Sequence, residues 1–307
     1  MTDKRRRSTG ATGLGFVAIV FWATTVSVAR GVLERLGVWR GAALIFLPAG
    51  VILILLSTLR ARGFRWVLHL SMRHLLLCGP LFVGYLCLFY LALGLAETRA
   101  DAIVVGLINY LWPTMILLFA IPLLGRRPRW PVLAVGSAVS LGGIVLATSV
   151  QAESLGALIG AFGSSGVPMI LAFVASVMWG LYSNLAKRYP QPNSTGAVGL
   201  FLLVTGLVLL IAVGNSWNGV DWNPRAIGEL SYAIIFPASL AYCLWDIAMR
   251  DGNIALLASA SNLIPVLATL LAGVYLRVPL GWELLGGAIG VVVGAFLCRL
   301  SFRQGAR

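Results

Sequence analysis

The feature that most constrains this chain is a series of ten apolar runs, each close to the length of a membrane-spanning helix. A helix needs roughly 20 mainly apolar residues to cross the hydrocarbon core of a bilayer. The runs cover residues 13–31, 41–59, 74–96, 102–123, 130–148, 166–186, 195–214, 229–249, 253–276 and 281–300. They are too long and too uniformly apolar to be the alternating strands of a membrane barrel. We therefore predict an all-α polytopic membrane protein with ten transmembrane helices.

The composition favours the same architecture. Of the 307 residues, 59% are hydrophobic and 11% are charged, whereas a soluble domain carries about 25% charged residues. Such a chain cannot cover a water-facing surface with polar groups, and the connections between the runs are too short to form a separate soluble domain. The lipid bilayer is therefore the expected surrounding of this multi-pass protein.

The positive charges are distributed unevenly along the chain. The formal net charge of +13 could by itself indicate a nucleic-acid partner. If the N-terminus is cytoplasmic, however, 17 of the 23 lysines and arginines fall in cytoplasmic segments and six fall on the other side. This asymmetry follows the positive-inside rule, so it predicts cytoplasmic termini and no nucleic-acid partner. The basic start "MTDKRRRSTG" resembles a signal peptide, but the long run after it, without a clear cleavage site, indicates an uncleaved first helix.

Three short matches indicate an internal repeat. "FWATTVSVAR" resembles "MWGLYSNLAK", "VGYLCLF" resembles "LAYCLWD", and "LINYLWPTMILLFA" resembles "ASNLIPVLATLLAG". The matched residues are Trp22 with Trp179 and Tyr85 with Tyr242, both at an offset of 157, and Pro113 with Pro265 at an offset of 152. A shorter connection before the ninth span accounts for the smaller third offset. Similar composition alone would explain matched Leu and Gly residues, but not Trp, Tyr and Pro recurring in one order.

The repeat predicts two halves of five helices. Residues 1–150 form the first half, residues 151–165 an external linker, and residues 166–307 the second half. An odd number of helices per half makes the second half enter the membrane from the opposite side. This inverted 5+5 repeat is the plan of secondary transporters, whose substrate site lies near the midplane between the halves.

The stretch "INYLWPTM" places a helix breaker and polar groups inside an apolar span. A proline within a helix removes one backbone hydrogen bond and frees the carbonyl four residues earlier. Pro113 would free the carbonyl of Asn109, and Pro265 that of Ser261. A freed polar group inside the bilayer needs a protein partner or a water-filled cavity. We therefore predict hinges at both prolines beside a wet cavity; the alternative is a tolerated kink sealed by neighbouring helices.

Aromatic and amide side chains share helix faces on several spans, which predicts a cavity with aromatic walls. Trp and Tyr also gather in belts at bilayer interfaces, which is the alternative explanation for them. Stacking with a flat ring is worth about 0.5–1.5 kcal/mol per pair. The candidate substrate-binding residues are Tyr85, Phe89, Asn109, Tyr110, Trp112, Trp179, Tyr182, Asn184, Tyr242, Trp245 and Asn262.

The chain lacks residues that several classes of protein require. The two histidines, His69 and His74, lie together at the start of one span, and the chain contains no phosphate-binding loop motif. We therefore expect no cofactor, no metal site and no enzymatic activity, although an integral membrane enzyme remains the alternative from another class. Asp246 is the one acid well inside a predicted span and a candidate for proton coupling. An i, i+4 salt bridge with Arg250 is the alternative role for its carboxylate.

The strings "VGLINYLWP", "LAYCLWD" and "SVMWGLYSNLAKRY", the paired prolines and the Gly-rich fifth and tenth spans together resemble the drug/metabolite transporter superfamily, in its EamA branch. The resemblance covers nearly the whole chain. It implies export of phenylalanine, tyrosine and tryptophan across a bacterial inner membrane by alternating access. Another small metabolite or a cationic drug is the alternative substrate, and a passive channel is the alternative mechanism. The residues by themselves predict only an aromatic cavity.

Overall fold

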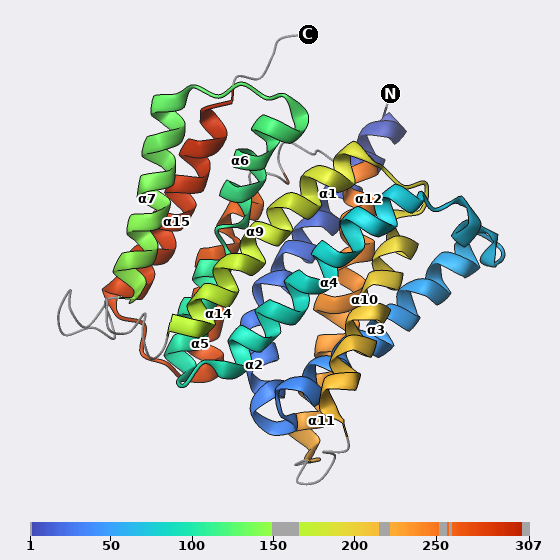
Figure 1. Cartoon of the computed structure of the whole chain (residues 1–307), viewed down its shortest axis with the longest axis horizontal. Coiled ribbons are helices and arrows are strands. Elements are labelled where there is room, and N and C mark those ends of the chain that lie inside the picture. Colours follow the sequence, from blue (N-terminus) through green and yellow to red (C-terminus); the bar gives the residue numbers. More distant parts are fainter. Residues whose placement is uncertain (1, 149–165, 215–221, 252–256, 258–259, 303–307) are drawn as a thin grey trace. The chain divides into compact units, whose positions relative to one another are not determined.

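The computed structural model describes residues 2–148, 166–214, 222–251, 257 and 260–302, without the side chains of residues 2–8, 148, 246, 249–251 and 262. In these parts the chain is helical throughout apart from turns and one isolated bridge between Pro128 and Phe302. The helices are α1 Thr2–Ala23, α2 Thr25–Leu36, α3 Val38–Arg60, η1 Phe64–His69, α4 Met72–Leu95, α5 Arg99–Asn109, α6 Trp112–Leu124, α7 Trp130–Thr148, α9 Gly166–Arg188, α10 Ser194–Val213, α11 Pro224–Ile235, η3 Phe236–Leu240, α12 Ala241–Asp251, η4 Ser261–Leu263, α14 Ile264–Leu276 and α15 Trp282–Leu300 (Figure 1).

The prediction of an all-α membrane protein is confirmed. Within the described residues, nine helical segments are long and apolar enough to cross a bilayer, and α14 is a shorter apolar helix in the place of the predicted ninth span. Three of the spans are built from more than one helix: α1 with α2, α5 with α6, and α11 with α12. All backbone groups must be satisfied inside lipid, so a helical chain of this hydropathy is the expected result.

The chain packs as two compact units that differ from the two halves of the sequence. Unit 1 comprises Met1–Val83 and Tyr189–Ile264, and unit 2 comprises Gly84–Arg188 and Pro265–Arg307. Each unit therefore takes helices from both halves of the sequence, and the boundary between the units falls within α4.

Each unit is held together by a close helix pair with one member from each half of the sequence. In unit 1, α3 lies along α10, and a Cβ built on Gly50 would come within 2.8 Å of the Leu203 Cα atom. In unit 2, α7 lies along α15, seen side by side in green and red in Figure 1. Glycine lets two backbones approach closely, which is how helices associate in membranes without a hydrophobic driving force.

The α7–α15 pair makes a sharp prediction about neighbouring glycines. A Cβ on Gly143 would lie 2.7 Å from the Gly287 carbonyl oxygen and 2.8 Å from the Val291 nitrogen. We expect Gly143→Ala to lower the free energy of unfolding by about 1–3 kcal/mol because backbone atoms must move apart. Thermal unfolding of the purified protein in detergent measures this. The matched control is Gly142→Ala, because a Cβ there meets nothing within 4 Å; equal losses in both variants would contradict the prediction.

The fourth span is interrupted at its proline instead of being kinked. We predicted Pro113 inside a continuous helix, but α5 ends at Asn109 and α6 begins at Trp112, so Pro113 is the second residue of a new helix. A proline in the first turn of a helix loses no intrahelical hydrogen bond, which explains why the chain restarts there. Pro265 likewise is the second residue of α14, directly after η4. Both prolines therefore mark helix starts.

Candidate functional site

Four of the predicted aromatic residues form one continuous cluster inside unit 2. Tyr85 and Phe89 lie one turn apart on α4, with parallel rings whose centroids are 6.1 Å apart. Trp179 and Tyr182 lie three residues apart on α9, with a centroid distance of 5.1 Å. Tyr85 and Trp179 join the two helices at 4.7 Å. The i, i+3 and i, i+4 spacings that suggested shared faces therefore do bring these rings together.

Asn109 adds a polar group to this cluster. It is the last residue of α5 and is 3% exposed. Its Oδ1 atom has no hydrogen-bond partner among the described residues. Leaving a buried acceptor unpaired costs about 1–3 kcal/mol. This oxygen is therefore a place where a ligand donor or a water would be stabilised.

Tyr110 and Trp112, the two aromatic residues of the "NYLWP" stretch, lie at the break in the span. Tyr110 follows Asn109 directly and is buried, and Trp112 opens α6 with its side chain partly exposed. The Tyr110 backbone nitrogen donates to the Gly106 carbonyl and the Leu111 nitrogen to the Ile108 carbonyl, both at 3.0 Å. The two-residue connection, Tyr110 and Leu111, is thus a tight turn that contains one aromatic residue and is followed by another.

The Asn184 amide group contacts backbone carbonyls, whereas a ligand-binding amide is expected to face a cavity. Its Nδ2 atom donates to the Ile116 carbonyl and to the Gly180 carbonyl, both at 2.9 Å, and the residue is buried. Both amide hydrogens are therefore engaged by backbone, and one of these bonds ties α9 to α6. Gly180 allows that approach, because a Cβ there would lie 2.9 Å from the Met115 carbonyl carbon.

Tyr242 and Trp245 belong to a second cluster, which lies inside unit 1. Both contact Trp22 on α1, each with a centroid distance of 5.3 Å. Phe82, in the unit 1 part of α4, lies 6.3 Å from Tyr242. The list of candidate residues omitted Trp22 and Phe82. The repeat contained the signal for Trp22, since it is the residue matched with Trp179.

The two clusters are related by the repeat. Trp22 contacts Tyr242 in unit 1, and Trp179 contacts Tyr85 in unit 2. Trp179 is the repeat partner of Trp22, and Tyr242 is the repeat partner of Tyr85, at the same offset of 157. Each unit therefore contains one Trp–Tyr contact, formed by residues that the repeat matches with those of the other contact.

Two predicted residues lie outside the described side chains. Asp246 falls in α12 and Asn262 in η4, but neither side chain is described. The side chain of Arg250, the predicted partner of Asp246, is not described either. Their predicted roles therefore stay predictions. Among the residues that the structure describes, no three His, Cys, Asp or Glu side chains come together as a metal site would require.

Comparison with known proteins decides the family. The model of the EamA-like transporter family matches residues 10–149 and 166–300 of this chain. The chain belongs to this family. Two aromatic amino acid exporters named YddG are relatives of this EamA-family chain: that of Salmonella typhimurium (strain 14028s / SGSC 2262) is 32% identical, and that of Escherichia coli (strain K12) is 33% identical. Each alignment covers 96% of this chain and 98% of the relative.

The fold agrees with a solved structure as well. One crystal structure is of a chain that is 26% identical in sequence. The match covers 97% of this chain and 99% of that chain, with a TM-score of 0.65. The chain is therefore a multi-pass membrane protein of a transporter family, and the family and relative names indicate a transporter rather than an enzyme. Its family accounts for the apolar helices and for the presence of two matching segments.

Proposed function

We propose that this chain exports phenylalanine, tyrosine and tryptophan across a bacterial inner membrane as a secondary transporter, working by alternating access. The observation that carries the proposal is the ring cluster of Tyr85, Phe89, Trp179 and Tyr182 beside the unpaired Asn109 oxygen. Relatives named as aromatic amino acid exporters support the same substrate class. Rings suit the side chain of an aromatic amino acid, and a polar acceptor suits its ammonium group.

The chemistry of the cluster fits such a substrate in two ways. An aromatic side chain entering the cluster would stack on or meet the edge of neighbouring rings, at about 0.5–1.5 kcal/mol per pair. The ammonium group would donate to Oδ1 of Asn109 and gain from the negative faces of the surrounding rings. The Tyr85 hydroxyl would offer a second polar contact. A substrate without a ring would keep the polar contacts alone and bind more weakly.

The proposed motion uses the interrupted spans. Pro113 and Pro265 each sit at the start of a helix that follows a break, and a break lets the two segments of a span change direction without losing internal hydrogen bonds. Asn109 ends the segment before the first break. The predicted inverted halves, 1–150 and 166–307 with both termini cytoplasmic, would allow the same change to open either side in turn.

The direct test is exchange transport in reconstituted liposomes. Vesicles holding the purified protein are loaded with unlabelled tryptophan and placed in a trace of labelled tryptophan. We expect saturable uptake of label, because a carrier exchanges one bound molecule for another. External phenylalanine and tyrosine should compete, whereas leucine, which has a similar size but no ring, should not.

Two results would contradict this proposal. Flux that neither saturates nor shows exchange would indicate a channel. Equal competition by leucine or by a nucleoside would remove the aromatic substrate class while leaving a carrier of the same family. Protein-free liposomes and liposomes holding a heat-denatured sample give the background.

A further inference from the structure

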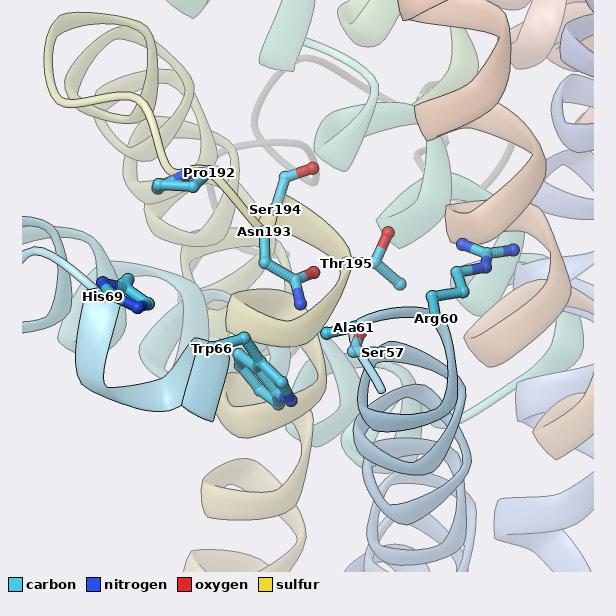
Figure 2. A pocket seen from close by; sticks show the side chains of 9 residues that line it. All are labelled: Ser57, Arg60, Ala61, Trp66, His69, Pro192, Asn193, Ser194 and Thr195. Atoms are coloured by element: carbon cyan, nitrogen blue, oxygen red, sulfur yellow. The ribbon is translucent and has the colours of Figure 1, made fainter. Parts of the chain in front are cut away.

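A separate cavity lies within unit 1, and it shares no lining residue with either aromatic cluster. It has a volume of about 560 Å³ and lies between the C-terminal end of α3, the short helix η1 and the start of α10 (Figure 2). Its lining residues are Ser57, Arg60, Ala61, Trp66, His69, Pro192, Asn193, Ser194 and Thr195. We call it the α3–α10 pocket.

The walls of the α3–α10 pocket are fixed by side-chain contacts. Trp66, which is buried, donates from Nε1 to the Thr58 hydroxyl at 3.1 Å. Its ring lies directly against Gly196, where a Cβ would collide with it. Asn193 accepts a hydrogen bond from the Gly196 backbone nitrogen at 2.9 Å and so caps α10. The pocket is therefore a formed cavity with a rigid indole on one side and a helix start on another.

The lining is suited to an anion. Ser57 is 1% exposed, and its hydroxyl has no hydrogen-bond partner among the described residues. A buried hydroxyl without a partner is costly, so a ligand that accepts its hydrogen would be stabilised there. Arg60 supplies a positive charge one turn later on α3, and the start of the 20-residue helix α10 adds the positive end of its dipole. No carboxylate is among the lining residues.

The surroundings of the pocket are amphiphilic. Leu59 lies in the last turn of α3, and Phe64 and Leu68 lie in η1; they are exposed by 74%, 62% and 82%. Arg62 and Arg65 are exposed in the same connection. Exposed apolar side chains next to arginines are typical of a segment that lies at the membrane interface, among lipid headgroups. A ligand with a negatively charged head and an apolar tail would match both surfaces.

We propose that the α3–α10 pocket binds a phosphate group, and that the headgroup of an anionic phospholipid supplies it. The phosphate would accept hydrogen bonds from the Ser57 hydroxyl and the Arg60 guanidinium, while the acyl chains would lie along Leu59 and Leu68. Guanidinium–phosphate pairs are strong because the hydrogen bonds are charge-assisted. The site is independent of the transport site, so it stands whether or not the substrate proposal holds.

Binding to the purified full chain tests this proposal. Native mass spectrometry in detergent measures the fraction of protein carrying phosphatidylglycerol as its concentration rises, with phosphatidylcholine in parallel. Thermal unfolding with and without inorganic phosphate tests the free anion. We expect phosphatidylglycerol to bind and Arg60→Gln to weaken that binding by about ten-fold. Ser57→Ala should weaken it by about five-fold.

Matched variants separate binding from folding. Arg65→Gln removes one positive charge from the neighbouring helix η1 without changing a lining residue. Ser27→Ala removes another buried hydroxyl without a described partner, on α2 and outside the pocket. Both should keep the affinity for phosphatidylglycerol. Without lipid, Ser57→Ala should unfold at the same temperature as the unmodified protein or a higher one, because it removes an unpaired polar group.

Each outcome of these experiments either supports or contradicts the phosphate site. Binding of phosphatidylglycerol alone that is lost in the Ser57 and Arg60 variants supports the lipid headgroup. Stabilisation by inorganic phosphate that is lost in the same variants supports the phosphate site but replaces the lipid with a free anion as its source. Equal binding of phosphatidylcholine and phosphatidylglycerol, or equal loss in Arg65→Gln and Arg60→Gln, would overturn the proposal.

Discussion

Trp179→Ala is expected to reduce exchange of labelled tryptophan at least about ten-fold while leaving the amount of folded protein in the membrane unchanged. Trp179 is the central ring of its cluster, since it contacts Tyr85 at 4.7 Å and Tyr182 at 5.1 Å. Its removal takes away the ring that joins α4 to α9 and one wall of the proposed site. The substrate ring would lose its stacking on this indole, and a loss of about 1.4 kcal/mol, within the range for an aromatic pair, corresponds to about ten-fold.

The controls distinguish a lost binding surface from a lost fold. Trp130→Ala removes an exposed tryptophan at the start of α7 and should leave exchange intact. Trp179→Phe keeps a ring and should retain part of the activity. Exchange rates at saturating and low tryptophan, together with the thermal unfolding temperature, are compared for each variant. If Trp179→Ala transports tryptophan as well as Trp130→Ala does, the ring cluster is not the substrate site.

Glu229→Gln is expected to cause the largest loss of stability among single polar changes in unit 1. The Glu229 side chain is 7% exposed; its Oε2 accepts from Arg35 Nη1 at 2.6 Å and its Oε1 from Arg225 Nε at 2.9 Å. Arg35, on α2, also donates to the Gly31 carbonyl at 2.8 Å, so the carboxylate links α11 to α2. Breaking a buried ion pair from one side costs about 3–5 kcal/mol. We expect Tm to fall by roughly 5–10 °C.

The exposed second partner of Glu229 provides the comparison. Arg225 contacts the same carboxylate, but its side chain is 60% exposed, so Arg225→Gln should cost less than about 1 kcal/mol. Thermal unfolding in one detergent ranks the variants. A loss in Glu229→Gln no greater than that in Arg225→Gln would show that burial adds nothing to this link.

The sequence predicted which aromatic residues share a helix face, but not which groups of other helices each side chain contacts. The spacing of Tyr85 with Phe89 and of Trp179 with Tyr182 indicated shared faces, and the structure brings these four rings together. Asn184 could not be judged in the same way. Whether its amide faces a cavity or the carbonyl of a neighbouring helix depends on the approach of α6 to α9, which helix periodicity does not encode.

The proline positions show a second limit of local reasoning. Pro113 was expected to interrupt hydrogen bonding inside one helix, and it instead stands in the first turn of a new one. The sequence "NYLWP" is compatible with both, because a proline permits either a kink or a helix start. The tight turn after Asn109, with its backbone bonds to Gly106 and Ile108, selects the second.

The sequence by itself determined a helical, multi-pass chain with two matching segments, and it also indicated the transporter family. It could do so because lipid leaves a backbone no partner outside the helix, so that runs of about 20 apolar residues allow one local structure. Only the tertiary structure decided which side chains meet: the pairing of Trp22 with Tyr242, the link from Glu229 to Arg35, and the pocket around Ser57. Those contacts join residues far apart in the chain. They depend on the rotation and approach of each helix against its neighbours, which the hydropathy of the sequence does not determine.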